Sequence, residues 1–405
     1  MIFLKGFWRG LVKLLSPVLG GLFLCAALIG YLTPDALTAA TTDSAFLNGN
    51  FPLSLHYEEN TVTAAASDKQ TPSLKAQLLL LGFFPVKEVN VTISDHQQVY
   101  VGGNAFGLRL YTDGLVVSSI SSIQTEKGIA DPAADAGLEQ GDILLSVNGE
   151  TLCTNEQLAD IVTGQADTPL HFRVKRRERI FSADITPVYD TQTKSSKLGL
   201  HVRDSIAGIG TMTFIDPDSH RFAGLGHGLC DTASGCLMPL LNGDIVPIRI
   251  TSVVKSMCGH PGTLCGSFAD SDAEGTLSQN SEHGVYGQIN TLPQQGELIP
   301  VAFRQEIVRG SAQLICTIDD TSGPCAYNVE IEDISYNDRQ SVKNMVIHIT
   351  DERLLRQTGG IVQGMSGSPI LQNGQLAGAL THVFINDPTR GYAVFAETMT
   401  AFTDR

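Results

Sequence analysis

The chain has 405 residues, of which 42% are hydrophobic and 40 are glycine, and its formal net charge is −15. This length predicts two or three domains, and the composition favours β-rich globular folding over a helical bundle. The negative charge argues against nucleic acid as a partner and against broad adhesion to anionic lipid. Neither a zinc-type Cys-x-x-Cys pair nor a phosphate-binding glycine loop occurs, so we expect no metal and no cofactor.

The N-terminal stretch has the pattern of a membrane segment. Lys5, Arg9 and Lys13 precede an uncharged run over 14–32 that is long enough to cross a bilayer as a helix. The basic side is expected to stay in the cytoplasm, with the rest of the chain exported. We predict a signal-anchor over 1–32, with a cleaved signal peptide as the alternative because small residues follow at 36–40.

Residues 33–73 are polar and weakly patterned, which predicts a spacer. The next stretch, 74–188, is predicted to be a separate domain with a preceding strand. Residues 99–110 have the order strand, glycine loop, strand, and residues 131–149 combine a short alanine helix, a Gly-Asp turn, an apolar strand and an Asn-Gly turn. Together they resemble bacterial PDZ domains.

That resemblance implies a peptide-binding groove. Its carboxylate-binding loop would be Ala105, Phe106, Gly107 and Leu108, whose backbone N–H groups would receive a peptide C-terminus. Thr154 is a suitable N-cap, with Gln157 three residues later, for a helix through Val162 that forms the other wall. The alternative is a closed PDZ domain used only for packing or as a lid.

Residues 189–197 are predicted to be a linker, and 198–405 contain many short strand patterns with few helical ones. This distribution predicts a double β-barrel or a β-sandwich. The whole chain is therefore expected to be mainly β.

The stretch 359–369 places Ser366 between glycines, directly before a hairpin with an Asn373-Gly374 turn. A serine nucleophile needs this setting, with free N–H groups facing a developing oxyanion. Gly364 and Ser366 would supply those N–H groups. The alternative is a plain glycine-rich turn.

A general base for Ser366 must be an imidazole, and His227 has glycines on both sides that leave room for it. A carboxylate usually orients such a base. Spacing alone does not choose among the candidates, which are Asp231, Asp244, Asp270, Asp272 and Asp351.

Three stretches, 216–227, 349–369 and 381–389, are together similar to the stage IV sporulation protein B serine peptidases of endospore-forming bacteria. The resemblance implies a chymotrypsin-like peptidase with His227 as general base, Ser366 as nucleophile and Asp351 as the orienting acid. Asp270 or Asp272 would suit the commoner spacing of such an acid. Ser368 lies in the same motif, but Ser366 is the serine that fits the Gly-x-Ser-Gly-x-Pro pattern.

The resemblance also implies a role. The family peptidase is made in the forespore, crosses its inner membrane to face the intermembrane space, and cuts itself near its N-terminus. It then cleaves an extracytoplasmic segment of a membrane protein that restrains an intramembrane protease, which leads to activation of a late sigma factor. The alternatives are a catalytically silent scaffold that binds membrane partners and a general exported quality-control protease.

The chain has eight cysteines, of which Cys25 lies in the apolar run and Cys153 in the PDZ stretch. In an exported domain the other six predict three local disulfides. The alternative is six reduced thiols that pack as small apolar groups. The near pairs are Cys230 and Cys236, Cys258 and Cys265, and Cys316 and Cys325.

Overall fold

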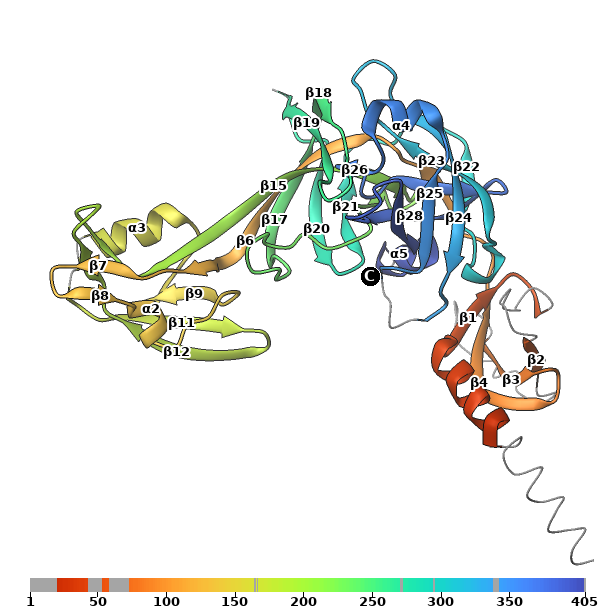
Figure 1. The fold of residues 1–405 in the computed structure, drawn as a ribbon, viewed down its shortest axis with the longest axis horizontal. Helices are drawn as coiled ribbons and strands as arrows, with labels where there is room; N and C mark the ends of the chain where they lie inside the picture. The colour runs from red at the N-terminus through yellow and green to blue at the C-terminus, as the bar shows by residue number, and fades with distance from the viewer. Residues whose placement is uncertain are drawn as a thin grey trace, which may run out of the picture.

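The computed structural model describes residues 20–42, 53–57, 73–163, 165, 167–269, 272–293, 296–337 and 342–403. Figure 1 shows a small N-terminal sheet, a central body of two β-barrels, and a PDZ domain at the far end of a long ribbon. The predicted mainly β fold with a PDZ domain and a double barrel is confirmed.

A helix over 20–32 covers the later part of the predicted membrane segment, and residues 1–19 lie outside the described residues. Among the helices that the structure describes, none is both long and apolar enough to span a bilayer.

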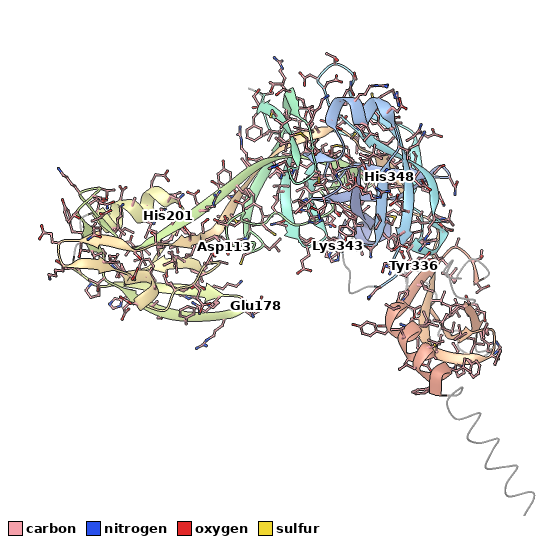
Figure 2. All side chains as sticks on the ribbon, in the orientation of Figure 1. Asp113, Glu178, His201, Tyr336, Lys343 and His348 are labelled. Carbon is pink, nitrogen blue, oxygen red and sulfur yellow. The ribbon has the colours of Figure 1, made fainter. Side chains whose placement is uncertain are left out.

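The N-terminal sheet corrects the predicted spacer over 33–73, because the described part of that stretch supplies two of its four strands. Leu37 is buried together with Leu78 and Val89, and Tyr336 of the second barrel packs on this cluster. Tyr336 lies where the sheet meets the barrel (Figure 2). The strand order is β1-β4-β3-β2, with β1 Ala36–Ala39, β2 Leu53–Tyr57, β3 Ser73–Leu80 and β4 Phe84–Ile93.

The first barrel is closed because β6 pairs with β17 on one side and with β15 on the other. Its interior is filled by apolar side chains that include Phe106, Leu108 and Phe222. In spatial order the strands are β6 Ala105–Ile120, β17 Leu240–Val246, β20 Gly275–Ser281, β21 Gly284–Ile289, β16 Arg221–Gly224 and β15 Leu200–Ile215.

The second barrel contains the predicted hairpin. Asn373 and Gly374 have φ values of +52° and +77°, the left-handed pair that a tight hairpin turn requires. In spatial order the strands are β23 Gly310–Cys316, β24 Cys325–Ile334, β25 Met345–Ile349, β29 Arg390–Phe395, β28 Gln375–Val383 and β27 Pro369–Gln372.

Smaller elements surround the barrels. One short sheet, β18-β19-β26, brings the segment before Ser366 against residues 262 and 263 of β19. These elements are β5 Gln98–Val101, β22 Leu298–Pro300, β18 Ile248–Val254, β19 Gly262–Phe268, β26 Val362–Gln363, η2 Arg304–Glu306, α4 Glu352–Thr358 and α5 Ala396–Thr403.

The PDZ domain packs α3 over a sheet whose apolar residues, among them Leu144 and Phe172, are buried. Helix α3 begins as predicted, since the N–H of Gln157 donates to Oγ1 of Thr154 at 3.2 Å. Its elements are β7 Ile123–Thr125, β8 Gly128–Ala130, α2 Pro132–Asp135, β9 Ile143–Val147, β10 Glu150–Thr151, α3 Asn155–Thr163, β11 Leu170–Arg176, β12 Arg179–Ile185, β13 Val188–Asp190 and β14 Ser195–Lys197.

The PDZ domain is inserted into the first barrel, which corrects the predicted boundaries at 74–188, 189–197 and 198–405. β6 precedes the PDZ domain and β15 follows it, and these two 16-residue strands pair along most of their length. One end of each strand belongs to the PDZ core and the other to the barrel core. Residues 189–197 form part of the β13-β14 hairpin rather than a free linker.

Candidate active site

Ser366 lies at the tip of the loop between β26 and β27, and glycines set the shape of that loop. Gly364 and Gly367 have φ values of +101° and +93°, which L side chains rarely adopt. A Cβ on Gly367 would lie 2.0 Å from the carbonyl oxygen of Thr211 and 2.4 Å from the nitrogen of Leu225. The loop therefore packs directly on the first barrel.

Hydrogen bonds from Thr211 of β15 hold this loop in place. Its N–H donates to the carbonyl oxygen of Ser366 at 2.9 Å, and its hydroxyl donates to the carbonyl oxygen of Gly364 at 2.9 Å. The Ser366 hydroxyl donates to the carbonyl oxygen of Thr381 on β28 at 2.8 Å. Ser366 is thus fixed between the two barrels.

The structure distinguishes the two serines of the motif. Ser366 is partly exposed, whereas Ser368 is fully buried and its hydroxyl donates to the carbonyl oxygen of Met365 at 2.6 Å. In the described part of the chain, the backbone N–H groups of Gly364 and Ser366 have no hydrogen-bond acceptor. They are therefore available to an oxyanion, as the predicted oxyanion hole requires.

His227 follows β16 after a left-handed turn at Leu225 and Gly226, both with φ of +66°. Its Nδ1 lies 2.9 Å from the carbonyl oxygen of Gly228. Because a carbonyl oxygen only accepts, Nδ1 carries the proton and Nε2 is the basic nitrogen. Burial lowers the pKa of His227, so the imidazole is neutral at neutral pH, as a general base must be.

The loops that carry His227 and Ser366 meet at Thr381. Gly226, the residue before His227, packs on Thr381: a Cβ atom added to Gly226 would lie 3.0 Å from the methyl group of Thr381. Among the hydrogen bonds of the described residues, however, none joins Ser366 to His227. The predicted base and nucleophile therefore lie on loops that meet at Thr381. The Ser366 hydroxyl donates to the carbonyl oxygen of Thr381, and Nδ1 of His227 donates to that of Gly228.

Asp351 has a different place from the one that the resemblance implied. It is the N-cap of α4, where its carboxylate accepts hydrogen bonds from the N–H of Arg353 at 2.9 Å and the N–H of Asn328 at 3.2 Å. The guanidinium of Arg353 completes an ion pair at 2.8 Å. In the described residues, no hydrogen bond joins Asp351 to His227, so its contacts support the helix that leads to the Ser366 loop.

The other candidate acids do not reach His227 either, as far as the described residues extend. Asp231 is buried and pairs with Arg203 at 3.0 Å, and Asp244 lies in β17 opposite Thr276. Asp272 is exposed, and Asp270 lies outside the described residues.

The His227 ring also contacts His382, on the strand that leaves the Ser366 hairpin. The two ring centroids are 4.8 Å apart and the rings are tilted by 39°. Only its position directly after Thr381, on the strand that leaves the Ser366 hairpin, could have indicated this contact.

The predicted carboxylate-binding loop at 105–108 was wrong. Ala105, Phe106, Gly107 and Leu108 lie in β6, opposite residues 208–211 of β15, and Gly107 and Leu108 also pair with β17. Phe106 and Leu108 are buried in the first barrel. All four residues pair with β15, and Gly107 and Leu108 are paired on both sides of the strand, so this segment is a barrel strand and not a loop that receives a peptide C-terminus.

A groove of the PDZ domain lies instead between α3 and the start of β15. It has a volume of about 310 Å³ and is lined on one side by Leu158, Ala159 and Val162. On the other side is the glycine turn Leu198–Leu200, where Gly199 has φ of +75°. The buried Oδ1 of Asn155, at the same groove, has no hydrogen-bond partner among the described residues.

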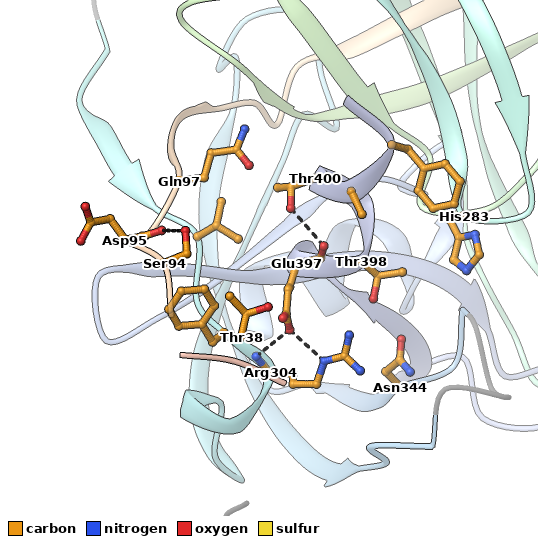
Figure 3. A pocket seen from close by; sticks show the side chains of 14 residues that line it. Thr38, Ser94, Asp95, Gln97, His283, Arg304, Asn344, Glu397, Thr398 and Thr400 are labelled. Carbon is orange, nitrogen blue, oxygen red and sulfur yellow. Dashed lines mark hydrogen bonds and ion pairs between the residues drawn. The ribbon is translucent and has the colours of Figure 1, made fainter. Parts of the chain in front are cut away.

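A second pocket, of about 520 Å³, lies where the N-terminal sheet meets the second barrel (Figure 3). The Glu397 carboxylate lies in its lining and accepts hydrogen bonds from the backbone N–H of Arg304 at 3.1 Å and from the Arg304 guanidinium at 2.8 Å. Neither Ser366 nor His227 lines this pocket.

The structure does not contain the three predicted disulfides, because all eight cysteines are free thiols. Cys316 and Cys325 are nevertheless opposite each other on β23 and β24, and burial raises the pKa of the Cys316 thiol. In the strand pairs of the described residues, Cys230 is opposite Leu237 and Cys265 is opposite Ser252, so neither of these cysteines faces its near partner across a strand pair.

Two barrels with a serine and a histidine at their junction, joined to a PDZ domain, are the architecture of a PDZ-containing serine peptidase. The family model described as SpoIVB peptidase S55 matches residues 194–400, and a PDZ model matches residues 130–176. The chain belongs to the SpoIVB peptidase S55 family.

More distant likenesses cover small parts of the chain. A protein named as a zinc metalloprotease from Bartonella henselae is 31% identical over 22% of this chain and 24% of its own. A similarly named protein from Brucella suis biovar 1 is 35% identical over 20% of this chain and 21% of its own. The chain thus spans less than a quarter of the length of these relatives.

One solved structure, the PDZ domain of the SdrC-like protein from Listeria monocytogenes, matches with a TM-score of 0.19 and 20% identity. The match covers 23% of this chain and 90% of that one. Our assignment of the PDZ domain rests on the family model and on the topology described above.

Proposed function

We propose that the protein is a signalling serine endopeptidase in which Ser366 is the nucleophile and His227 the general base. One observation carries this proposal: the Ser366 hydroxyl donates to the carbonyl oxygen of Thr381, and the imidazole of His227 packs on the ring of the next residue, His382. Next to them, the N–H groups of Gly364 and Ser366 have no acceptor among the described residues.

In the proposed reaction, Oγ of Ser366 attacks the carbonyl carbon of the scissile peptide bond, and its proton moves to Nε2 of His227. The N–H groups of Gly364 and Ser366 stabilise the oxyanion. The C–N bond breaks, and the amine leaves with the proton from His227. Water then attacks the acyl ester and gives a proton to His227, the bond between the acyl carbon and Oγ breaks, and His227 returns the proton to Oγ as the carboxylic acid product leaves.

We assign Asp351 a supporting role in this proposal. Its contacts with Arg353 and Asn328 fix the start of α4, which ends at Thr358 shortly before the Ser366 loop. A residue that shapes that loop affects the peptidase without touching the reacting atoms.

The PDZ groove is proposed to bind an extended peptide, either the N-terminal segment of the chain itself or the substrate. Support comes from its apolar walls and from the unpartnered Oδ1 of Asn155, which a peptide N–H would satisfy. We further propose self-cleavage near the N-terminus and cleavage of an extracytoplasmic segment of a membrane protein that restrains an intramembrane protease. The family to which the chain belongs supports this sporulation role.

The location we propose follows from the same role: the protein is exported and at first tethered at the forespore inner membrane, facing the intermembrane space. The basic residues before the apolar run support this orientation. Detection of the intact N-terminus in the forespore membrane fraction, and its loss as sporulation proceeds, would test it.

A second candidate is a silent scaffold, and the hydrogen bond of the Ser366 hydroxyl to Thr381 instead of His227 favours it. A fluorophosphonate probe, which reacts only with an activated serine, separates the two. Labelling of the full chain that disappears in both Ser366→Ala and His227→Ala would support the peptidase. The absence of labelling and of N-terminal processing in the parent would favour the scaffold.

A further inference from the structure

The segment directly after His227 runs from the first barrel to the strands that carry the PDZ domain. We call residues 228–238 the His227 loop. Its root is tied to the barrel, because the side chain of Asn280 on β20 accepts from the N–H of Leu229 at 2.8 Å and donates to its carbonyl oxygen at 2.9 Å. The loop therefore begins at the proposed general base and is held at that end by the peptidase itself.

Asp231, in the outer turn of the His227 loop, is buried against the two long strands of the ribbon. Its carboxylate forms an ion pair with Nε of Arg203 on β15 at 3.0 Å and accepts from the hydroxyl of Ser118 on β6 at 3.2 Å. It also accepts from the N–H groups of Ala233 and Ser234, at 3.2 and 2.7 Å. One carboxylate thus joins the turn of the loop to both strands of the ribbon.

The ribbon is irregular at the place where it meets the His227 loop. Two consecutive residues of β15, His201 and Val202, are opposite residues 119 and 117 of β6, so Ser118 is an extra residue between them. A bulge of this kind turns a side chain in a new direction. Nε of Arg203 donates to Oγ of Ser118 at 3.3 Å, so the two groups that hold the carboxylate lie side by side.

The charge of Asp231 makes this connection strong. Its side chain has no exposed area, whereas that of Arg203 is 46% exposed. Burial opposes ionisation of Asp231, but the hydrogen bonds it accepts and the charge of Arg203 lower its pKa, so the carboxylate is ionised at neutral pH. A buried carboxylate that loses its cation is unfavourable. The loop also packs on the PDZ domain, where a Cβ atom added to Gly141 would lie 2.5 Å from Sγ of Cys236.

We infer that Asp231 is a positioning residue of the peptidase: by fixing the outer turn of the His227 loop on Arg203 and Ser118, it makes the PDZ ribbon part of the frame that holds the general base. A loop that is fixed at both ends has fewer conformations, and small displacements of a reacting group slow a reaction strongly. Asp231 does not contact the imidazole, and its role is separate from that of an acid that orients the ring. This inference rests on the proposed roles of His227 and Ser366.

The test measures fluorophosphonate labelling of the full chain over a range of probe concentrations, which separates the maximal rate from the half-saturating concentration. Arg203→Met removes the guanidinium and keeps the apolar stem. We expect its maximal rate to fall at least ~10-fold, within the ~10²-fold cost that a small misplacement can have, at an unchanged half-saturating concentration. Arg203→Lys should recover most of the rate, because an ammonium can pair with Asp231. Asp231→Asn should add little to Arg203→Met in the double variant, since both changes break one interaction.

Arg176→Met is the matched control, because it breaks a similar ion pair within the PDZ domain, between the partly exposed Arg176 and the buried Asp142 at 2.7 Å. Thermal unfolding confirms that each variant is folded at the assay temperature.

Three results would overturn the inference while His227→Ala stays unlabelled and the proposed function survives. They are a parental maximal rate in Arg203→Met, no recovery in Arg203→Lys, and equal slowing in Arg176→Met. If His227→Ala labels like the parent, the proposed function fails and this inference fails with it.

Discussion

The backbone N–H of Thr211 donates to the carbonyl oxygen of Ser366 at 2.9 Å, and Thr211 lies on the strand that begins at the PDZ groove. β15 starts at Leu200, which lines the groove, and continues without interruption to Ile215 in the first barrel. Figure 1 shows this strand and β6 as the ribbon that connects the two domains, and Figure 2 places His201 at its PDZ end. The PDZ groove and the Ser366 loop therefore share one element.

Thr211→Val tests whether this strand shapes the nucleophile loop. The substitution keeps the shape of the side chain but removes the hydrogen bond to the carbonyl oxygen of Gly364, leaving a buried acceptor unpaired. We expect a loss of about 1–3 kcal/mol in the free energy of unfolding and slower labelling of Ser366. Denaturant unfolding and labelling kinetics measure the two effects. Thr251→Val, on the exposed part of β18, is the control, and equal behaviour of the two variants would contradict the prediction.

Ser366→Ala and Ser368→Ala test which serine of the motif is the nucleophile and which only supports the structure. Ser366→Ala should abolish covalent labelling and lower peptide cleavage by ~10³-fold or more, because the attacking oxygen is lost. Ser368→Ala removes a buried hydrogen bond to Met365 and should cost about 1 kcal/mol of stability while labelling continues. Labelling that vanished in Ser368→Ala, in a folded protein, would reverse the assignment.

Asp351→Asn tests the helix-capping role through pH. The hydrogen bond from Arg353 is the main cause that lowers the pKa of Asp351, so ionised Asp351 stabilises the fold. With a lowered folded pKa, this contribution is complete above the unfolded pKa of about 3.9 and is lost as pH falls further. The parent should exceed Asp351→Asn in thermal stability at pH 7, and the difference should shrink below about pH 4.

Asp351→Ala should cost about 1 kcal/mol as the loss of an N-cap. A variant that kept the parental unfolding temperature and yet lost all labelling would instead mean that Asp351 acts directly on His227.

Ala159→Trp should block the peptide groove. Ala159 is exposed on α3 and lines the groove, so an indole would fill the space next to Leu200. Asp160→Trp, one residue further on the same helix and outside the groove lining, is the matched control. Fluorescence anisotropy with a labelled peptide from residues 33–73 should show at least ~10-fold weaker binding for Ala159→Trp alone, since lost contacts of ~1.4 kcal/mol have that effect. Equal binding by both variants would contradict the location of the groove.

Local patterns in the sequence predicted the elements that depend on neighbouring residues. The Thr154 cap, the Asn373-Gly374 hairpin and the glycine setting of Ser366 all use short-range chemistry and appear as expected. Ala105–Leu108 was misassigned for the opposite reason. Its strand-glycine-strand pattern fits a PDZ loop, but pairing with β15 and β17, far along the chain, places it in a barrel.

The same reason explains the other differences. The turn at Leu198–Leu200 looked like the start of the peptidase because the PDZ insertion can be recognised only when β6 and β15 are seen to pair. Asp351 was assigned by resemblance, whereas its contacts with Arg353 and Asn328 depend on local helix geometry. The contact of His382 on β28 with His227, which follows β16, joins residues from different barrels, and no spacing in the sequence encodes it.

The most direct test of the proposed peptidase is to treat the full chain with a fluorophosphonate probe and locate the modified residue by peptide mass spectrometry. We expect one modification, on Ser366, that is absent in Ser366→Ala and in His227→Ala although both variants unfold at the parental temperature. A folded parent in which Ser366 remains unmodified, or in which the modification lies on another serine, would contradict the assignment of Ser366 as the nucleophile.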